Sequence, residues 1–555
     1  MPRFLLLLLL PVAFLSAEPA DLLLIHGNIY TGSQTPAQAE AIAVKDGRIV
    51  YVGTDAGAEY YRPGARRVID LGGRTLLPGL NDAHLHLAGI GFRELSFDLE
   101  GTTGVADLRE RLRARLSQTA AKRWITGRGW IETHWQPAVF PTAKDLDDLS
   151  PDNPVVLTRA DGHALVANSV ALKLARIDRT TPNPSGGEIL HYADSGEPTG
   201  LLVDEAMGLV RRLVPPPTTA EIEQALVVGA EREVALGWTG IQIAGHDWAE
   251  AEMVRRLVAA GKISLRVYDA VSAPGEDAER MLAAGPVLDE TDGRYTRRSV
   301  KLYIDGSLGS RGAALLEPYA DYASRGLLMN SAEKLRPFLV AALQKGIQVE
   351  THAIGDRGNR LMLDLYEETF HAVPAVERAM AEPRWRIEHA QVLDPADIPR
   401  FARLGVIASM QPSHAIGDLY FAPQRLGPAR LAGAYAWQSL LKSGAVLAAG
   451  SDAPVERGEP MIEFYAAVAR RSLDGFANED WHREQRLTRE QALRAMTLDA
   501  AYAAFQDRER GSIAVGKRAD FTVLSADIMQ IPEPEILRTR CVMTIVGGAV
   551  VFQAK

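Results

Sequence analysis

Two histidines separated by one residue are the first feature of this sequence that could do chemistry. His84 and His86 stand in the segment DAHLH (82–86), at the end of an apolar run. Because residues two apart in a β-strand point to the same side, both imidazoles can face one divalent metal ion. Such pairs also occur among solvated or core histidines, so the pair indicates a metal site only together with further ligands.

Four later segments supply ligand types of this kind, each on or just after a short apolar run. They are Lys301 in VKLYIDG, His352 in VETHAIGD, His389 in RIEHAQ and Asp452 in AAGSDAP. Taken singly, these residues could be a surface charge, two core histidines and a helix N-cap. Their recurrence at the ends of successive apolar runs favours a single site, because active sites of (β/α)8 barrels lie at the carboxyl ends of the strands.

The composition limits which ligands and which partners are available. The single cysteine, Cys541, rules out an intramolecular disulfide and a cysteine-based metal site. Histidines, carboxylates and a modified lysine remain as ligands. The 555 residues include 61 basic and 70 acidic ones, with a net charge of −9 and no long basic run, which argues against nucleic acid as a partner.

An alternation of short apolar runs and longer helical stretches must position these residues. It is typical of βα units and predicts an α/β chain with a (β/α)8 barrel over residues 76–506. The predicted barrel strands lie at residues 74–86, 237–245, 265–271, 299–306, 346–353, 385–391, 406–412 and 445–454. The stretch at about 95–236 has its own strands and helices, so we expect a large insertion after the first strand that forms a lid or pocket wall.

Both ends of the chain lie outside this pattern. Residues 21–75 and 507–555 contain short alternating β runs between turn residues, and we expect them to pair into one small β-sandwich. Residues 1–20 indicate a secretory signal peptide, with an apolar run too short to span a bilayer comfortably. We therefore expect export to the periplasm or the medium and no stable membrane partner after cleavage; an uncleaved anchor is the alternative.

An ordered set of motifs covers nearly the whole chain after this leader. Beside the metal motifs it includes GRGWIETHWQ (127–136), GLLVDEAM (200–207), KLYIDGSLGSRGAAL (301–315), RIEHAQVL (386–393) and SMQPSHA (409–415). The sequence resembles the amidohydrolase superfamily, and more closely its amidohydrolase-3 (YtcJ-like) branch, which includes N-substituted formamide deformylases. The resemblance implies a TIM-type barrel, a metal-dependent hydrolase and a small-molecule substrate, and it hints at a homodimer.

Carried over by position, the resemblance implies a centre for one or two metal ions. His84 and His86 would bind the first ion, and His352 and His389 the second. Lys301 would bridge the two ions after its side-chain nitrogen has reacted with carbon dioxide, because a carbamate binds cations and an ammonium group does not. Imidazole and carboxylate ligands suit zinc first, with manganese, iron, nickel or cobalt as alternatives.

The same resemblance gives Asp452 two tasks, as a metal ligand and as the catalytic proton carrier. It would accept a proton from the metal-activated water and deliver it to the departing amine. For substrate binding we single out Trp130, His163 and His414. The alternatives are burial in the insertion's own core for Trp130 and a structural role for His163, while His414 could contact an oxyanion.

These observations favour hydrolysis of a C–N bond in a linear amide, N-acyl or N-formyl compound, other than a peptide bond. The same site acting on an ester, lactone, carbamate or cyclic amide is the alternative, because the loops of a shared fold choose the substrate. A non-catalytic periplasmic binding or regulatory protein is an alternative of another class. It would predict a damaged set of ligands, whereas all six ligand positions are filled.

Overall fold

The computed structural model describes residues 20–33, 37–160, 162–184, 186–477 and 481–555. The predicted signal peptide at residues 1–20 therefore lies, except for Ala20, outside the described residues. None of the helices in the described ranges is long and apolar enough to cross a membrane.

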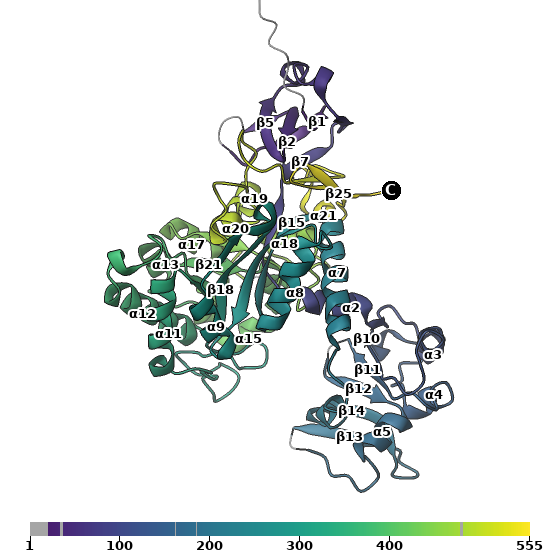
Figure 1. Cartoon of the computed structure of the whole chain (residues 1–555). Helices are drawn as coiled ribbons and strands as arrows, with labels where there is room; N and C mark the ends of the chain where they lie inside the picture. The colour runs from purple at the N-terminus through teal and green to yellow at the C-terminus, as the bar shows by residue number, and fades with distance from the viewer. Residues whose placement is uncertain (1–19, 34–36, 161, 185, 478–480) are drawn as a thin grey trace, which may run out of the picture. The chain divides into compact units, whose positions relative to one another are not determined.

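The chain forms two compact units, each of which is described separately. Unit 1 contains the chain up to Leu87 together with Ala230–Lys555, and unit 2 contains Ala88–Gly229 (Figure 1). Unit 2 lies between the first and the second barrel strand in sequence, where we expected the insertion.

Unit 1 is built around a parallel sheet whose described strands follow the order β22-β21-β20-β19-β18-β16-β15-β8. The short strand β17 (Val287–Asp289) adds an antiparallel pairing to β18. The eight parallel strands confirm the predicted (β/α)8 barrel. Their bounds are β8 (Leu80–Leu85), β15 (Trp238–His246), β16 (Arg266–Ser272), β18 (Tyr295–Tyr303), β19 (Gln348–Ala353), β20 (Arg386–His389), β21 (Ile407–Met410) and β22 (Leu447–Ala449).

The seam between the first and the last barrel strand is closed by the loop that follows β22. The backbone N–H of Asp452 donates to the carbonyl of His84 at 2.7 Å, and that of His86 donates to the carbonyl of Ala453 at 2.8 Å. Gly450 permits this close approach, because a Cβ atom at that position would lie 2.4 Å from the backbone nitrogen of His84. The seam therefore consists of the segments that carry three predicted metal ligands.

Helices connect successive strands of the barrel, as the sequence pattern predicts. Helix α8 shows how they start and pack: the side chain of its N-cap, Asp247, accepts from the backbone N–H of Glu250 at 2.8 Å, and its apolar residues are buried. Larger helices of this set are α7 (Thr219–Leu236), which begins in unit 2, α8 (Trp248–Ala259), α9 (Glu276–Ala284), α11 (Ala332–Lys345), α12 (Asp356–Ala372), α13 (Ile398–Leu404), α17 (Trp437–Ser443) and α18 (Pro460–Ala469).

Both ends of the chain contribute to one β-sandwich in unit 1. One sheet has the order β5-β4-β1-β6 and the other β25-β24-β23-β7-β2-β3. In the second sheet β7, from the N-terminal part, pairs with β23, from the C-terminal part, and Figure 1 shows purple N-terminal strands next to yellow C-terminal strands. Buried apolar residues of both sheets form one core cluster. The strands are β1 (Leu22–Ile25), β2 (Asn28–Tyr30), β3 (Gln38–Ala39), β4 (Ala41–Lys45), β5 (Arg48–Gly53), β6 (Arg67–Asp70), β7 (Thr75–Pro78), β23 (Phe521–Leu524), β24 (Cys541–Val546) and β25 (Ala549–Gln553).

A buried ion pair joins this sandwich to the barrel. Nε and Nη2 of Arg266, at the start of β16, donate to the two carboxylate oxygens of Asp520 at 2.6 and 3.0 Å. Both side chains are almost completely buried. Such a bidentate pair fixes the relative orientation of the two groups as well as their distance.

Unit 2 has its own six-stranded sheet, with the order β13-β14-β12-β11-β10-β9 in the described residues. Two clusters of buried apolar side chains form its core. Its strands are β9 (Phe97–Asp98), β10 (Ile125–Trp130), β11 (Val155–Arg159), β12 (Ala164–Ala167), β13 (Gly187–His191) and β14 (Pro198–Asp204), with helices α3 (Val105–Leu116), α4 (Ala143–Asp147) and α5 (Ser169–Ala175).

Candidate metal centre

The barrel brings the six predicted ligands to the carboxyl ends of its strands, where they line one cavity of about 380 Å³. Their places are His84 in β8, His86 just after it, Lys301 in β18, His352 in β19, His389 at the end of β20 and Asp452 after β22.

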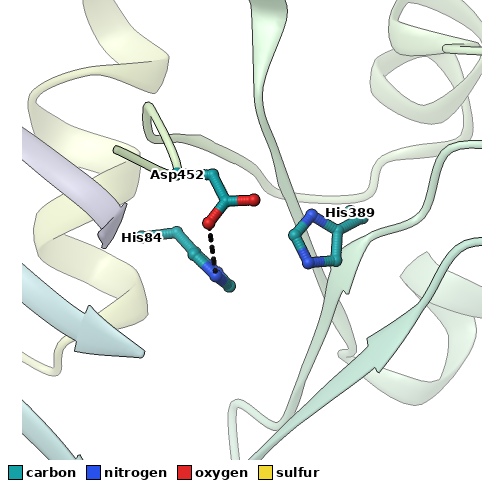
Figure 2. Close-up of side chains that lie close together, drawn as sticks. All are labelled: His84, His389 and Asp452. Atoms are coloured by element: carbon teal, nitrogen blue, oxygen red, sulfur yellow. Dashed lines mark ion pairs between the residues drawn. The ribbon is translucent and has the colours of Figure 1, made fainter. Parts of the chain in front are cut away.

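Three of these side chains lie close enough to hold one ion. Ligand atoms of His84, His389 and Asp452 all lie within 4.8 Å of one another, and Figure 2 shows the Asp452 carboxylate directed toward the His84 ring. His86 joins them, with its Nε2 3.3 Å from Oδ1 of Asp452. His352 lies next to this group, because its ring centroid is 4.6 Å from that of His389.

Lys301 is buried among these ligands. Its Nζ lies 3.2 Å from Nε2 of His84, and burial lowers the pKa of the amine. Gly245 in β15 has φ +90° and leaves room for the lysine side chain, because a Cβ atom there would lie 2.7 Å from Cβ of Lys301. The lowered pKa favours the neutral amine, which is the form that can react with carbon dioxide.

Two of the predicted ligands have a backbone conformation that residues other than glycine rarely adopt. His389 has φ 74° and Asp452 has φ 57°, and residues in the left-handed region cost about 1–3 kcal/mol each unless the surroundings hold them there. At the end of β20, the unusual conformation lets the consecutive residues Glu388 and His389 both approach His84. Strain of this kind is concentrated at functional sites.

Hydrogen bonds fix the protonation pattern of two histidines. Nδ1 of His84 donates to the Glu388 carboxylate, and Nδ1 of His389 donates to Oε1 of Gln411 at 2.8 Å. An amide or carboxylate oxygen can only accept, so each neutral ring keeps its lone pair on Nε2. Partners of this kind orient the ligands of metal sites. Sequence reasoning missed Glu388 and Gln411; the signal for Glu388 was an acidic residue within a buried strand beside a ligand.

A buried arginine supports Glu388 in turn. Nε of Arg386 donates to Oε1 of Glu388 at 2.7 Å, and the same guanidinium donates to Gln242 and Ser409. Although burial opposes it, Arg386 and then His84 hold the pKa of Glu388 well below its usual range. Glu350 lies farther from the guanidinium, at 3.6 Å, and burial raises its pKa to about 7.

Burial favours the neutral form of three histidines of the site. Burial lowers the pKa of His84 to about 4 and that of His352 to about 3, and it lowers the pKa of His389 well below the usual value. Although burial opposes it, His86 beside the carboxylate holds the pKa of Asp452 well below its usual range. Neutral imidazoles beside a charged carboxylate are the protonation states that bind a divalent metal.

Two buried atoms test whether a metal fits this site. Oδ1 of Asp452 and Nε2 of His352 are buried and have no hydrogen-bond partner among the described residues. Buried polar atoms are rarely unpaired in proteins, so an orphaned atom calls for an explanation such as an ion. These atoms, together with the lone pairs on His84 and His389, fit a divalent cation.

His414 lines the same cavity. Nε2 of Gln391 donates to its Nδ1 at 2.9 Å, so the neutral ring carries its proton on Nε2. That nitrogen lies 3.5 Å from Oδ2 of Asp452 and has no hydrogen-bond partner among the described residues. His414 can thus donate a hydrogen bond into the cavity. Nearby, Asp305 accepts from three backbone N–H groups and orders the loop around the site.

The other two predicted substrate contacts lie in unit 2. Trp130 is fully buried in the core of that unit, and its Nε1 donates to the carbonyl of Leu157 at 2.8 Å. This environment accounts for Trp130 as a core residue. His163 is exposed, with its Nδ1 2.8 Å from Oδ1 of Asp204. A role for Trp130 or His163 in substrate binding stays a prediction.

Comparison with curated proteins identifies relatives along most of the chain. Protein LONG AFTER FAR-RED 3 of Arabidopsis thaliana is 35% identical over 92% of this chain and 88% of its own length. The protein named YtcJ of Bacillus subtilis (strain 168) is 33% identical over 95% of this chain and 99% of its own length. An N-substituted formamide deformylase of Arthrobacter pascens is 28% identical over 96% of this chain and 98% of its own length.

Solved structures and family patterns give the same assignment. A metal-dependent hydrolase from Pyrococcus horikoshii OT3 superposes with a TM-score of 0.74 and 26% identity, over 92% of this chain and 99% of the other. The sequence pattern described as "Amidohydrolase family" matches residues 67–552. The chain therefore belongs to the amidohydrolase family.

Proposed function

We propose that this chain is a metal-dependent hydrolase of the C–N bond in a linear amide, N-acyl or N-formyl compound. One observation carries the proposal: in one cavity, the Asp452 carboxylate lies 3.3 Å from Nε2 of His86 and 3.5 Å from Nε2 of His414. The similarity to an N-substituted formamide deformylase supports the choice of bond.

The ligand set would hold one or two divalent ions, with zinc as the first candidate. When bound, the ions would supply Lewis acidity and lower the pKa of water at the site. The residues that would hold them are His84, His86 and Asp452 for one ion, His352 and His389 for the other, and a carboxylated Lys301 between them.

The side chains of this protein then perform the proton transfers. Asp452 accepts a proton from the attacking water as the new C–O bond forms. Nε2–H of His414 donates to the carbonyl oxygen, which gains negative charge as the bond forms. Asp452 returns the proton to the amide nitrogen as the C–N bond breaks, which gives a carboxylic acid, or formic acid, and an amine; at neutral pH the acid loses a proton and the amine gains one.

The carboxylation of Lys301 is a separate proposal with its own test. The side chain is fully buried, its amine pKa is lowered by burial, and it lies beside His84. We expect ¹³C-labelled bicarbonate to give a carbamate resonance that is absent in Lys301→Ala. A metal-loaded, active protein without that resonance would contradict this part of the mechanism.

Export is a further proposal, because the leader at residues 1–20 has the pattern of a secretory signal. Fractionation of the host and amino-terminal sequencing of the purified protein test it. A cytoplasmic protein that keeps these residues would contradict it.

The decisive test of function is turnover by the purified, metal-loaded protein. The substrate panel contains N-formyl amines, N-acyl amines, esters and lactones, and the variant is Asp452→Asn. Asp46→Asn is the matched control, because Asp46 is exposed and also has a positive φ, at 48°. We expect amide hydrolysis that persists in the control and falls by roughly 10³-fold or more in Asp452→Asn. Hydrolysis of esters alone, or amide turnover that survives in Asp452→Asn, would contradict the proposal.

A further inference from the structure

One wall of the catalytic cavity carries two acidic side chains around His414. Asp418 lies one helical turn after His414 on α14 (Pro412–Asp418), so both residues share one face of this helix. Glu456 approaches from the loop after β22, with its Oε1 3.8 Å from Nε2 of His414. All three residues line the cavity. The acidic wall therefore lies next to the reacting centre.

The environment of these carboxyl groups contains little positive charge. Lys301 supplies the only lysine or arginine side chain among the described residues that line the cavity, and it is buried beside the metal ligands. Burial raises the pKa of Asp418 and of Glu456. A bound cation would favour the charged form of both carboxyl groups.

A second observation points to a ligand at this wall. His414 is 7% exposed, and its Nε2 faces the cavity without a hydrogen-bond partner among the described residues. The hydroxyl of Tyr435 donates to Asp418 from behind and holds that carboxylate in place. Beside the acidic wall, Leu308, Phe421 and other apolar side chains line the cavity. The cavity thus offers a hydrogen-bond donor, an apolar surface and two carboxyl groups that can bind a cation.

We infer that Asp418 and Glu456 select substrates whose amine portion carries a second, positively charged amino group. The inference rests on the proposed function and names its substrate class: mono-N-formyl or mono-N-acyl diamines. His414 binds the carbonyl oxygen, the methylene chain packs on the apolar side chains, and the ammonium group lies between the two carboxylates. A substrate that ends in a carboxylate is repelled by the same wall.

Three formamides of matched length separate charge from size. N-formyl-1,4-diaminobutane ends in an ammonium group, N-pentylformamide in a methyl group and 5-formamidopentanoate in a carboxylate. We expect kcat/KM to fall in that order, with about tenfold or more between the first two, as for a partly buried ion pair. The variants are Asp418→Asn, Glu456→Gln and their combination. Glu59→Gln is the charge-matched control, because Glu59 is exposed on the terminal sandwich and pairs with Arg62.

Calorimetric binding of the product amines tests the inference independently of turnover. We expect 1,4-diaminobutane to bind about tenfold more tightly than pentylamine, and 5-aminopentanoate to bind most weakly. This preference persists in Glu59→Gln, shrinks in each single variant and disappears in the double variant. Equal affinity for the first two amines, or a preference that survives in the double variant, would overturn the inference.

The turnover and binding measurements distinguish failure of the proposed function from failure of this inference. If no formamide or other amide is hydrolysed but the charge preference in binding depends on Asp418 and Glu456, the proposed function is wrong and the cation site stands. If the neutral and the cationic formamide are hydrolysed equally well and their amines bind equally, the proposed function stands and the inference is wrong.

Discussion

Replacing Glu388 by glutamine tests how the protein prepares His84 for a metal. The carboxylate accepts from Nδ1 of His84 on one side and from Arg386 on the other. A glutamine has one acceptor oxygen for these two donors. If its oxygen turns to Arg386, its amide group faces His84, and the ring must move its proton to Nε2. The lone pair that binds the metal is then lost.

The expected losses of metal affinity and of stability follow from the two contacts that change, with His84 and with Arg386. Loss of an orienting partner lowers metal affinity by about 10–100-fold, or about 1.4–2.8 kcal/mol. The apo-protein also loses about 3 kcal/mol of stability, the lower end for a broken buried ion pair. The lower end applies because the Arg386 guanidinium keeps acceptors on Gln242 and Ser409.

Glu350→Gln is the matched control for this variant. Glu350 is a buried carboxyl group near the same guanidinium, at 3.6 Å from Arg386, whereas the ring of His84 bonds to Glu388. Burial raises the pKa of Glu350 to about 7, so a neutral amide resembles a form that the side chain already adopts near neutral pH. We expect its metal affinity to stay near that of the wild type.

Competition with a chromophoric zinc chelator gives the metal affinity of each protein, and urea unfolding of the apo-proteins gives their stability. The reasoning is refuted if Glu388→Gln binds zinc as tightly as the wild type. It is equally refuted if Glu350→Gln loses as much affinity, because the loss would then come from the buried charge network as a whole and not from the orientation of His84.

Three further predictions concern metal removal, the buried ion pair and unit 2. Removal of the metal by a chelator should lower the unfolding temperature, because zinc at about 100 times its dissociation constant stabilises the folded state by about 2.7 kcal/mol. Calorimetry measures this change. If added zinc raises the unfolding temperature of Asp452→Asn as much as that of the wild type, the metal does not bind at this site. Asp520→Asn should cost about 3–5 kcal/mol near neutral pH, because it leaves Arg266 without its buried partner. Although burial opposes it, Arg266 lowers the pKa of Asp520, so this contribution is present above the usual carboxyl pKa and is lost as the pH falls through the lowered pKa of the folded state. Urea unfolding at several pH values measures this contribution to the free energy of unfolding. If the difference between Asp520→Asn and the wild type does not shrink in acid, the Arg266–Asp520 ion pair is not its source. Trp130→Ala should destabilise unit 2 by about 3–5 kcal/mol, because core contacts are lost. Limited proteolysis should then cut faster within residues 88–229, and an unchanged cleavage rate would contradict a core role for Trp130.

The barrel, and the polar residues gathered at the ends of its strands, could be predicted because each strand end leaves a local mark in the sequence. An apolar run followed by a histidine or an aspartate is visible without any tertiary information, as for His352 and Asp452. The side chains that orient the ligands leave no such mark. Gln411 reaches His389 from the next strand end, and Gln391 reaches His414 in the same way. These contacts depend on the alignment of neighbouring strands, which spacing within one segment does not fix.

Strand alternation also fails at the end of β20. It predicts that consecutive residues point to opposite sides, so a site that uses His389 should turn Glu388 away. The positive φ of His389 breaks this rule, and both residues reach His84. Trp130 illustrates another limit, because an apolar aromatic residue has the same sequence pattern in a core as in a pocket wall. Its burial within unit 2 depends on the packing of the whole sheet.

The seam of the barrel has a consequence for the order in which the protein is assembled. Ser451 donates through its backbone N–H to Oδ1 of Asp82, a residue 369 positions earlier in the chain. Asp452 and His86 make the neighbouring seam contacts. Although β8 can pair with β15 earlier, a ribosome must therefore synthesise most of the polypeptide before β8 meets the segment after β22 and the barrel closes. Until then His84 and His86 lack the Asp452 carboxylate, so the complete set of predicted ligands exists only after the barrel has closed.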